Sequence, residues 1–383
     1  MTVIVNSAPL QPPRRALAFQ SALNLASGVS LSIVPPAVLS ISANTFAVPS
    51  QGIIAVAVMA ATFFGQVMFG FLVESRLATP GTERFVAVPR LLTIVGLVAA
   101  VGLALFSQVP LVVAVTLPFL FAALETGRGV SVAERYSTRE AWSAVALGLG
   151  AGLGVILALV GQQWGLIPLA AGIAAAILVR AVRAPWSSPR PDPAIRAWVV
   201  ADVTLTGVSY PLLNALILAL LGPAAATVFA AVSTVSGLLA VPLNFLRVRL
   251  LKEHSLLDTV VTGAALLAAT GAIAIGEATG LFGLAFGVSW TLAATALPLT
   301  IACLWRFASL FSAIPFTALR RAGRARLVTI LRGAAAAFTF GIAIPATFTQ
   351  QIWMVFGALL IGEVVLAATC EIARRRAPVR HGD

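Results

Sequence analysis

The sequence predicts an all-α membrane protein with twelve transmembrane helices in two lobes of six. Three observations support this fold class. Hydrophobic residues make up 60% of the 383 residues and charged residues only 10%, whereas about a quarter of the residues of a soluble domain are charged. The apolar runs are about 17 to 25 residues long, which suits helices that cross a bilayer and not the short alternating strands of a membrane β-barrel. Finally, the basic residues gather in every second connection between these runs.

The apolar runs are separated by polar or proline-containing breaks, and each run defines one expected helix. The first run is longer than the hydrophobic region of a signal peptide and no clean cleavage pattern follows it, so we expect it to remain as the first helix. In chain order, the expected helices cover residues 17–37, 52–73, 91–106, 110–124, 141–161, 165–179, 198–221, 224–246, 257–275, 290–317, 327–345 and 352–372.

The basic residues predict how these helices are oriented. All but two of the 25 Lys and Arg residues lie in connections on one side of the membrane, and the opposite connections hold none. Basic connections face the cytoplasm, so both termini are expected there. The formal net charge of +12 therefore reflects topology, and we expect no nucleic-acid partner. The two exceptions, Arg306 and Arg332, fall inside apolar runs.

The longest break divides the chain into equal parts. It reads RAVRAPWSSPRPDPAIR, residues 180 to 196, and its prolines exclude a helix inside the bilayer. We expect a first lobe at residues 1–182, a cytoplasmic linker at 183–197, and a second lobe with a basic tail at 198–383. Two halves of six helices that start on the same side are typical of transporters whose site lies between two lobes.

Several chemical functions are excluded by what the sequence lacks. Among the 13 acidic residues, only Glu277 falls in an outside connection, so a pair of external carboxylates for general acid and base catalysis is missing. The sequence has no Walker A, H-E-x-x-H or glycine-rich strand-to-helix motif. We therefore expect no enzyme, no catalytic residue, no cofactor and no metal site. Cys303 and Cys370 lack any metal-ligand spacing and are expected to pack in the core.

Arg306 is the most informative polar residue, because it lies in the apolar run IACLWRFASLF, residues 301 to 311. It is about 18 Å from the cytoplasmic boundary expected near Ala318, too deep for easy snorkelling. Its planar donor fork suits phosphate oxygens, which makes it a candidate substrate-binding residue. In the alternative, the helix breaks near Pro298 or Pro315 and leaves Arg306 at an interface.

Three other ionisable residues fall inside the spans: Asp202, Arg332 and Glu363. Arg332 and Glu363 are both expected at a depth of about 10 Å, so they could form a structural ion pair, or Arg332 could snorkel. Asp202 lies near the cytoplasmic boundary and could serve as a cap. Alternatively, Asp202 and Glu363 are candidate sites for a coupling proton or cation.

Uncharged polar residues extend this set, and Asn24, Gln66, Tyr210 and Asn214 are further candidates for substrate binding. Tyr210 and Asn214 are four residues apart, so they share one helix face. Such faces either line a wet cavity or make hydrogen bonds between helices.

Four segments of the chain resemble a known superfamily. Residues 218 to 253, with LGPAAA and PLNFLRVR, and residues 280 to 327, with LFGLAFG and RRAGRAR, are similar to regions of the multidrug/oligosaccharidyl-lipid/polysaccharide (MOP) flippase superfamily. In the first half, LPFLFAALETGRG at 117 to 129 and QSALNLASGVSLSIV at 20 to 34 resemble its polysaccharide, or Wzx-like, branch. The resemblance implies two six-helix lobes around a central cavity.

The resemblance also implies a substrate, a polyprenyl-diphosphate-linked oligosaccharide that crosses the bacterial cytoplasmic membrane by alternating access. The expected partners are this lipid, the surrounding membrane lipids and other membrane proteins of polysaccharide assembly. Two alternatives stay open. The chain could export small molecules or drugs coupled to protons or sodium, or it could be a non-transporting subunit of a polysaccharide synthase complex.

Overall fold

The computed structural model describes residues 14–77, 87–134, 136–182, 192–243, 246, 250, 256–322 and 324–376, and every regular element in these ranges is a helix. The elements are α1 (Arg14–Thr45), α2 (Val48–Phe69), the π-helical turn η1 (Gly70–Glu74), α3 (Ser75–Leu77), α4 (Arg90–Leu105), α5 (Pro110–Ala133), α6 (Ser137–Leu159), α7 (Leu166–Ala181), α8 (Pro193–Gly207), α9 (Ser209–Leu221), α10 (Pro223–Gly237), α12 (Leu256–Ala278), α13 (Leu281–Phe286), the 3₁₀ turn η2 (Gly287–Ser289), α14 (Leu292–Arg321), α15 (Ala325–Thr347) and α16 (Ile352–Arg375).

The prediction of a twelve-helix membrane protein is confirmed. Within the described residues, eight helices are long and apolar enough to cross a membrane, and four shorter apolar helices accompany them. Each predicted span falls on one of these helices. The predicted span 198–221 corresponds to α8 and α9 together, which begin at Pro193, inside the predicted linker; residues 183–191 of that linker lie outside the described residues.

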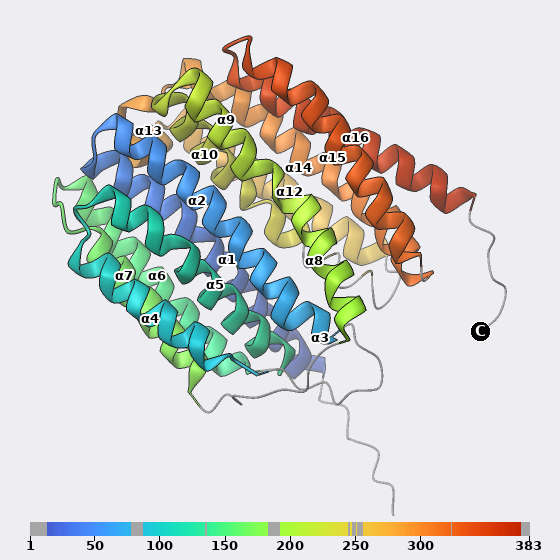
Figure 1. Cartoon of the computed structure of the whole chain (residues 1–383), viewed down its shortest axis with the longest axis horizontal. Coiled ribbons are helices and arrows are strands. Elements are labelled where there is room, and N and C mark those ends of the chain that lie inside the picture. Colours follow the sequence, from blue (N-terminus) through green and yellow to red (C-terminus); the bar gives the residue numbers. More distant parts are fainter. Residues whose placement is uncertain are drawn as a thin grey trace, which may run out of the picture.

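The helices form two groups that meet along α2 (Figure 1). Helices α1 to α7, blue to green, make up the first group, and α8 to α16, yellow-green to red, make up the second. Within the first group α2 packs on α5, and α6 packs on both α1 and α7; within the second, α16 packs on α14 and α15. Helix α2 also packs against α8, α9 and α10, so it carries much of the contact between the lobes.

Small residues allow close helix packing where an apolar driving force is missing. In lipid, helix association depends on close van der Waals contact, and glycine lets backbones approach each other. A Cβ atom on Gly150 of α6 would lie 2.6 Å from the Pro168 carbonyl oxygen of α7, and one on Gly154 would lie 2.4 Å from that of Gly165. Large apolar side chains such as Leu91 and Leu149 point outward, as expected of a surface that faces lipid.

The two ends of the helix bundle differ in chemistry. One end, at which α2 ends and α8 begins, carries Arg76, Arg196, Arg320 and Arg374, and we call it the basic end. At the opposite end α1 contacts α13 of the other lobe: the Ser40 hydroxyl and the Asn44 amide both donate to the Ala285 carbonyl oxygen, at 2.7 and 3.0 Å. The lobes are therefore joined directly at the opposite end.

Several arginines expected in connections lie on helices instead. Helix α5 continues to Ala133 and α7 to Ala181, beyond the predicted ends at residues 124 and 179, so Arg128 and Arg180 are helical. Arg76 and Arg180 are almost completely buried, with 1% exposure each. The predicted boundaries were too short because apolar runs mark the hydrocarbon core, while helices extend past it.

Candidate functional site

Arg306 lies in the middle of an unbroken helix. Helix α14 has 30 residues and continues through both Pro298 and Pro315. The alternative in which the helix breaks at one of these prolines is therefore wrong. Arg306 lies 15 residues before the last residue of α14, which corresponds to a distance of about 22 Å along the helix axis. This distance supports the expectation that its charge lies deep in the bundle.

The guanidinium group of Arg306 is held by aromatic rings. Its central carbon lies 4.0 Å from the ring centroid of Trp305 and 5.8 Å from that of Tyr210, and the two rings are 5.4 Å apart. Such cation–π contacts are worth about 0.5–2 kcal/mol depending on desolvation. No described carboxylate forms an ion pair with Arg306, and its Nε atom is buried without a hydrogen-bond partner. Two of the predicted binding residues, Arg306 and Tyr210, are thus brought together.

Arg306 also faces the end of helix α10. A Cβ atom added to Gly237, the last residue of α10, would lie 3.9 Å from Nη2 of Arg306. The chain continues from Gly237 in tighter turns, with the Leu238 and Leu239 amides donating to the Val235 and Ser236 carbonyls at 3.2 and 3.1 Å. The carbonyl end of a helix is partly negative and attracts cations. This arrangement offers a structural role for Arg306 that an experiment must separate from substrate binding.

The other predicted polar residues lie in different surroundings. Gln66 of α2 reaches the second lobe, because a Cβ atom on Gly207 of α8 would lie 3.5 Å from its Oε1 atom. Asn214 lies one turn from Tyr210, is fully buried, and has no hydrogen-bond partner for either amide atom among the described residues. Asn24 lies on α1, and its side chain is outside the described part.

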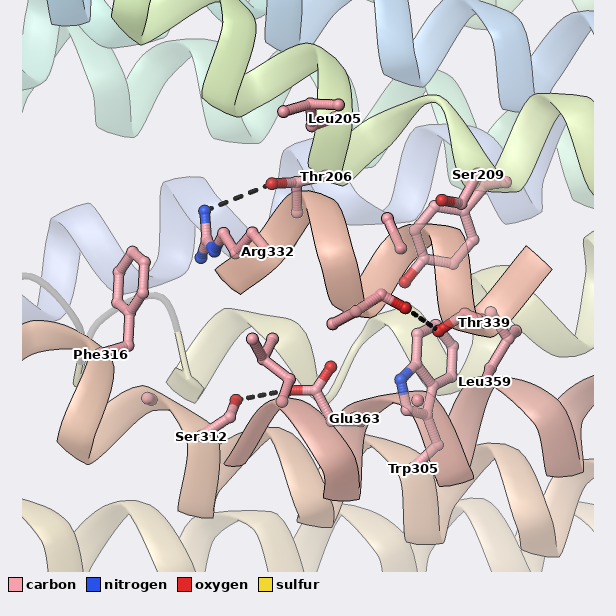
Figure 2. A pocket seen from close by; sticks show the side chains of 16 residues that line it. Leu205, Thr206, Ser209, Trp305, Ser312, Phe316, Arg332, Thr339, Leu359 and Glu363 are labelled. Carbon is pink, nitrogen blue, oxygen red and sulfur yellow. Dashed lines mark hydrogen bonds between the residues drawn. The ribbon is translucent and has the colours of Figure 1, made fainter. Parts of the chain in front are cut away.

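A cavity of about 110 Å³ lies inside the second lobe, between α8, α9, α14, α15 and α16 (Figure 2). Its polar lining includes Arg332 and Glu363 on facing sides, and the Ser312 hydroxyl donates a hydrogen bond to the Glu363 carboxylate. Tyr210, Trp305 and Phe316 contribute the aromatic part of the wall. The cavity is large enough for several water molecules and smaller than a typical drug pocket. Arg306 is not among its lining residues.

Asp202 is bound by two arginines from neighbouring helices. It is buried, with 4% exposure. Its Oδ2 atom accepts hydrogen bonds from Arg320 Nη2 at 2.5 Å and from Arg332 Nη1 at 3.0 Å. Arg332 also donates to the Thr206 hydroxyl at 3.3 Å, and both guanidinium groups lie over the Phe316 ring. The Oδ1 atom of Asp202 is buried without a partner.

This network corrects the predicted ion pair of Arg332 with Glu363. Arg332 pairs with Asp202, and Glu363 is bound by Ser312. The depth of Arg332 and Glu363 along their helices was the only basis for pairing them, and depth does not give the direction of a side chain. Helix α8 also begins five residues before the predicted span, so Asp202 lies about 14 Å into its helix. It is therefore within reach of α15.

The prediction from the sequence missed an ion pair in the first lobe. Arg180 donates to both carboxylate oxygens of Glu140, at 2.8 and 2.9 Å, and to the Leu124 carbonyl at 3.2 Å. Both side chains are at most 1% exposed. Glu140 is in the first turn of α6 and Arg180 in the last turn of α7, where each charge suits its helix dipole. That placement is the signal by which the pair could have been found.

The described residues hold no group of three His, Cys, Asp or Glu side chains that could bind a metal ion. Cys303 and Cys370 are both buried in apolar clusters, which confirms their predicted packing role.

The fold is that of the MATE proteins. A crystal structure of MATE in complex with Br-NRF is similar to this chain, with a TM-score of 0.51 and 18% identity. The alignment covers 96% of this chain and 98% of the MATE chain. A structure named protein A matches 98% and 97% of the two chains, with a TM-score of 0.53 and 10% identity. An inward-facing multidrug resistance MATE family transporter of the MOP superfamily matches 93% and 94%, with a TM-score of 0.45 and 16% identity. No protein-family model and no curated protein sequence matches the chain.

Proposed function

We propose that the chain is a membrane transporter that moves a polyprenyl-diphosphate-linked oligosaccharide across the bacterial cytoplasmic membrane by alternating access of its two lobes. The fold supports a transporter, because two lobes of six helices meet along α2, as in transporters whose site lies between two lobes. The resemblance of the sequence to the polysaccharide branch supports the lipid-linked substrate. Arg306 supports the anionic head group.

The observation that carries the substrate proposal is the state of the Arg306 side chain. Its positive charge lies in the middle of a 30-residue helix and is held by two aromatic rings. It has a buried Nε without a partner and no ion pair with a described carboxylate. A charge inside hydrocarbon costs several kcal/mol unless a partner or water compensates it. A diphosphate that passes through the site would supply that partner, and a guanidinium binds phosphate oxygens by two parallel hydrogen bonds.

The test compares Arg306→Lys and Arg306→Ala with the native protein in vesicles that contain a fluorescent lipid diphosphate. Lysine keeps the charge and loses the planar fork, while alanine loses both. We expect the rate of flipping to decrease from native to Arg306→Lys to Arg306→Ala. The matched control is Arg375→Ala, which removes an exposed arginine whose carboxylate partner lies on the same helix. This control should flip at the native rate.

The structural role at the end of α10 predicts a different result. If Arg306 only compensates the α10 carbonyl groups, Arg306→Ala should lower the melting temperature while the protein that remains folded flips at the native rate. That result would contradict the substrate role. Reduced flipping at an unchanged melting temperature supports it.

A second candidate function is an ion-coupled exporter of small molecules. The observation that favours it is the cavity of the second lobe, into which the Glu363 carboxylate points (Figure 2). No described arginine or lysine forms an ion pair with Glu363, which leaves this carboxylate as the candidate site for a coupling proton or cation. Asp202 is less suited to that role, because two arginines already neutralise it.

A non-transporting subunit of a polysaccharide synthase complex is the third class. Transport by the purified protein alone separates this class from the other two. Membrane lipids and other proteins of polysaccharide assembly remain proposed partners.

We place both termini in the cytoplasm and the connections without basic residues outside. In a variant without native cysteines, single cysteines at positions Ser50, Gln163 and Gln350 should react with an impermeant thiol reagent added from outside. Reaction only from the cytoplasmic side would reverse the proposed orientation.

A further inference from the structure

At the basic end, two arginines of the second lobe contact side chains of the π-helical turn η1 of the first lobe. The Glu74 carboxylate lies 3.8 Å from Arg320 Nη1 of α14. One turn earlier, the Phe71 ring lies 4.8 Å from the guanidinium carbon of Arg196 of α8. Glu74 and Phe71 belong to the first lobe, while Arg320 and Arg196 belong to the second. The two contacts join the lobes at the end opposite to the α1–α13 contact.

Arg320 is held in place for this contact by its own lobe. Its Nη2 atom donates to Asp202 at 2.5 Å, so its Nη1 atom remains available to Glu74. Asp202 is in turn fixed by Arg332 at 3.0 Å. The longer distance to Glu74 shows a weaker contact, which can break while Arg320 stays with its own lobe. Asp202 is thus a positioning residue.

The turn that presents Glu74 is unusual in its backbone. The Ser75 amide donates to the Gly70 carbonyl, which gives a turn one residue wider than that of an α-helix. Gly70 is packed closely on α8, because a Cβ atom there would lie 3.1 Å from Val203 Cγ2. Turns of this kind are rare in proteins, and those that do occur are often found at functional sites. The wide turn sets the direction of Phe71 and Glu74 relative to the rest of α2.

We propose that Glu74 and Arg320 form an ionic latch that keeps the two lobes together at the basic end, and that Asp202 positions Arg320 for it. This inference rests on the proposed alternating access, since a latch matters only where the lobes separate. The side chains of Glu74 and Arg320 are 36% and 26% exposed. Water and salt therefore reach the pair, and it is weak enough to open during a transport cycle.

The experiment measures the separation of the lobes and not transport. Spin labels are placed at Leu178 of α7 and Ile372 of α16, two exposed positions near the basic end, one in each lobe. The background is Cys303→Ala with Cys370→Ala. Distances between the labels are measured by pulsed electron paramagnetic resonance in vesicles without substrate. Glu74→Gln removes the charge of the latch, and Glu74→Asp keeps the charge on a shorter side chain.

The control is Glu371→Gln, which removes an equal charge at the same end of the molecule. Among the described residues, Glu371 forms ion pairs only with Arg374 and Arg375 of its own helix, so it makes no ion pair between the lobes. We expect Glu74→Gln to raise the ratio of separated to closed lobes about 1.4- to 5-fold, the range for a partly exposed ion pair. Glu74→Asp should give a smaller rise, and Glu371→Gln none.

Ionic strength provides a second readout that a packing role would not change. Salt at about 1 M screens exposed pairs, so it should shift the native distribution in the same direction as Glu74→Gln and leave the Glu74→Gln variant nearly unchanged. Two populations whose ratio is the same in native protein and Glu74→Gln would overturn the latch alone. One fixed distance in every variant would overturn the latch and alternating access together.

Discussion

The Glu140–Arg180 pair of the first lobe and the buried charges of the second lobe are held in opposite ways. In the first lobe, Arg180 uses its donors on both oxygens of Glu140 and on the Leu124 carbonyl, and none of its buried nitrogen atoms lacks a partner among the described residues. In the second lobe, Arg306 and Arg332 each have a buried Nε without a partner, and Asp202 has an unpartnered Oδ1. The second lobe also holds the cavity.

This difference separates structural charges from candidate functional charges. A fully satisfied buried pair has no capacity left for a ligand, so Glu140 and Arg180 fix α5, α6 and α7 to one another. Unsatisfied buried polar atoms cost free energy and persist where a ligand, ion or water completes them. The first lobe is not uniform in this respect, because Arg128 Nε and Arg139 Nη1 are also buried without a hydrogen-bond partner among the described residues. The contrast is therefore between the Glu140–Arg180 pair and the charges around the cavity of the second lobe.

The largest expected effect comes from breaking the pair of the first lobe. Arg180→Ala leaves the Glu140 carboxylate buried and unpaired, which should lower the free energy of unfolding by about 3–5 kcal/mol. The measurement is thermal unfolding in detergent together with the amount of protein in the membrane. Flipping per folded molecule should not change, because neither residue reaches the proposed site.

The double variant Glu140→Leu with Arg180→Met serves as the control for this prediction. Replacing a buried ion pair by apolar residues of similar volume is often neutral, so this variant should recover most of the lost stability. If the double variant were as unstable as Arg180→Ala, the loss would come from packing and not from an unpaired charge.

An intermediate effect is expected at Asp202. Asp202→Asn weakens two charge-assisted hydrogen bonds, each worth about 1.5–3 kcal/mol. The arginines it releases are only partly buried, with 26% and 13% exposure of the side chains, so water compensates part of the loss. We expect a decrease of about 1–3 kcal/mol in the free energy of unfolding, less than for Arg180→Ala. An equal or larger decrease would mean that the network of the second lobe is as structural as the pair of the first.

The fold could be predicted from the sequence because the bilayer fixes the position of each helix along the membrane normal. Its thickness sets the length of an apolar run, and the position of basic residues sets the side of each connection. These two constraints located all twelve spans. They do not locate helix ends outside the hydrocarbon, which is why the continuation of α5 to Ala133 and the burial of Arg180 were missed.

The site could be predicted only in part for the same reason. Depth indicated that Arg306 is too deep to snorkel, and the structure places it in mid-helix. Pairing needs a second coordinate, the rotation of each helix, and the sequence does not specify it without contacts. Arg332 was therefore paired with Glu363 at a similar depth, although α8 brings Asp202 to it. The contact of Tyr210 with Arg306 likewise depends on the rotation of two helices, so the sequence alone does not predict it.

A smaller effect is expected from the ring that holds Arg306. Trp305→Phe weakens the contact at 4.0 Å and removes part of a buried side chain, which should cost about 1–2 kcal/mol of stability. A double-mutant cycle of Trp305→Leu, which removes the ring, with Arg306→Ala isolates the interaction, and we expect a coupling of about 0.5–2 kcal/mol. A coupling of zero would show that the ring only packs beside the charge.

The smallest effect on stability, and the sharpest on function, is expected at Glu363. Glu363→Gln keeps the acceptor for the Ser312 hydroxyl and nearly the same volume, so the free energy of unfolding should change by less than about 0.5 kcal/mol. Flipping of a lipid diphosphate that depends on Arg306 should persist in this variant, whereas ion-coupled export of small molecules should be lost, because a neutral amide cannot take up a proton at neutral pH or balance a cation. The matched control is Ser312→Ala, which removes the hydrogen bond and keeps the carboxylate. If Glu363→Gln abolished flipping while Ser312→Ala did not, the charge in the cavity would drive transport of the lipid, and the cavity and Arg306 would belong to one mechanism.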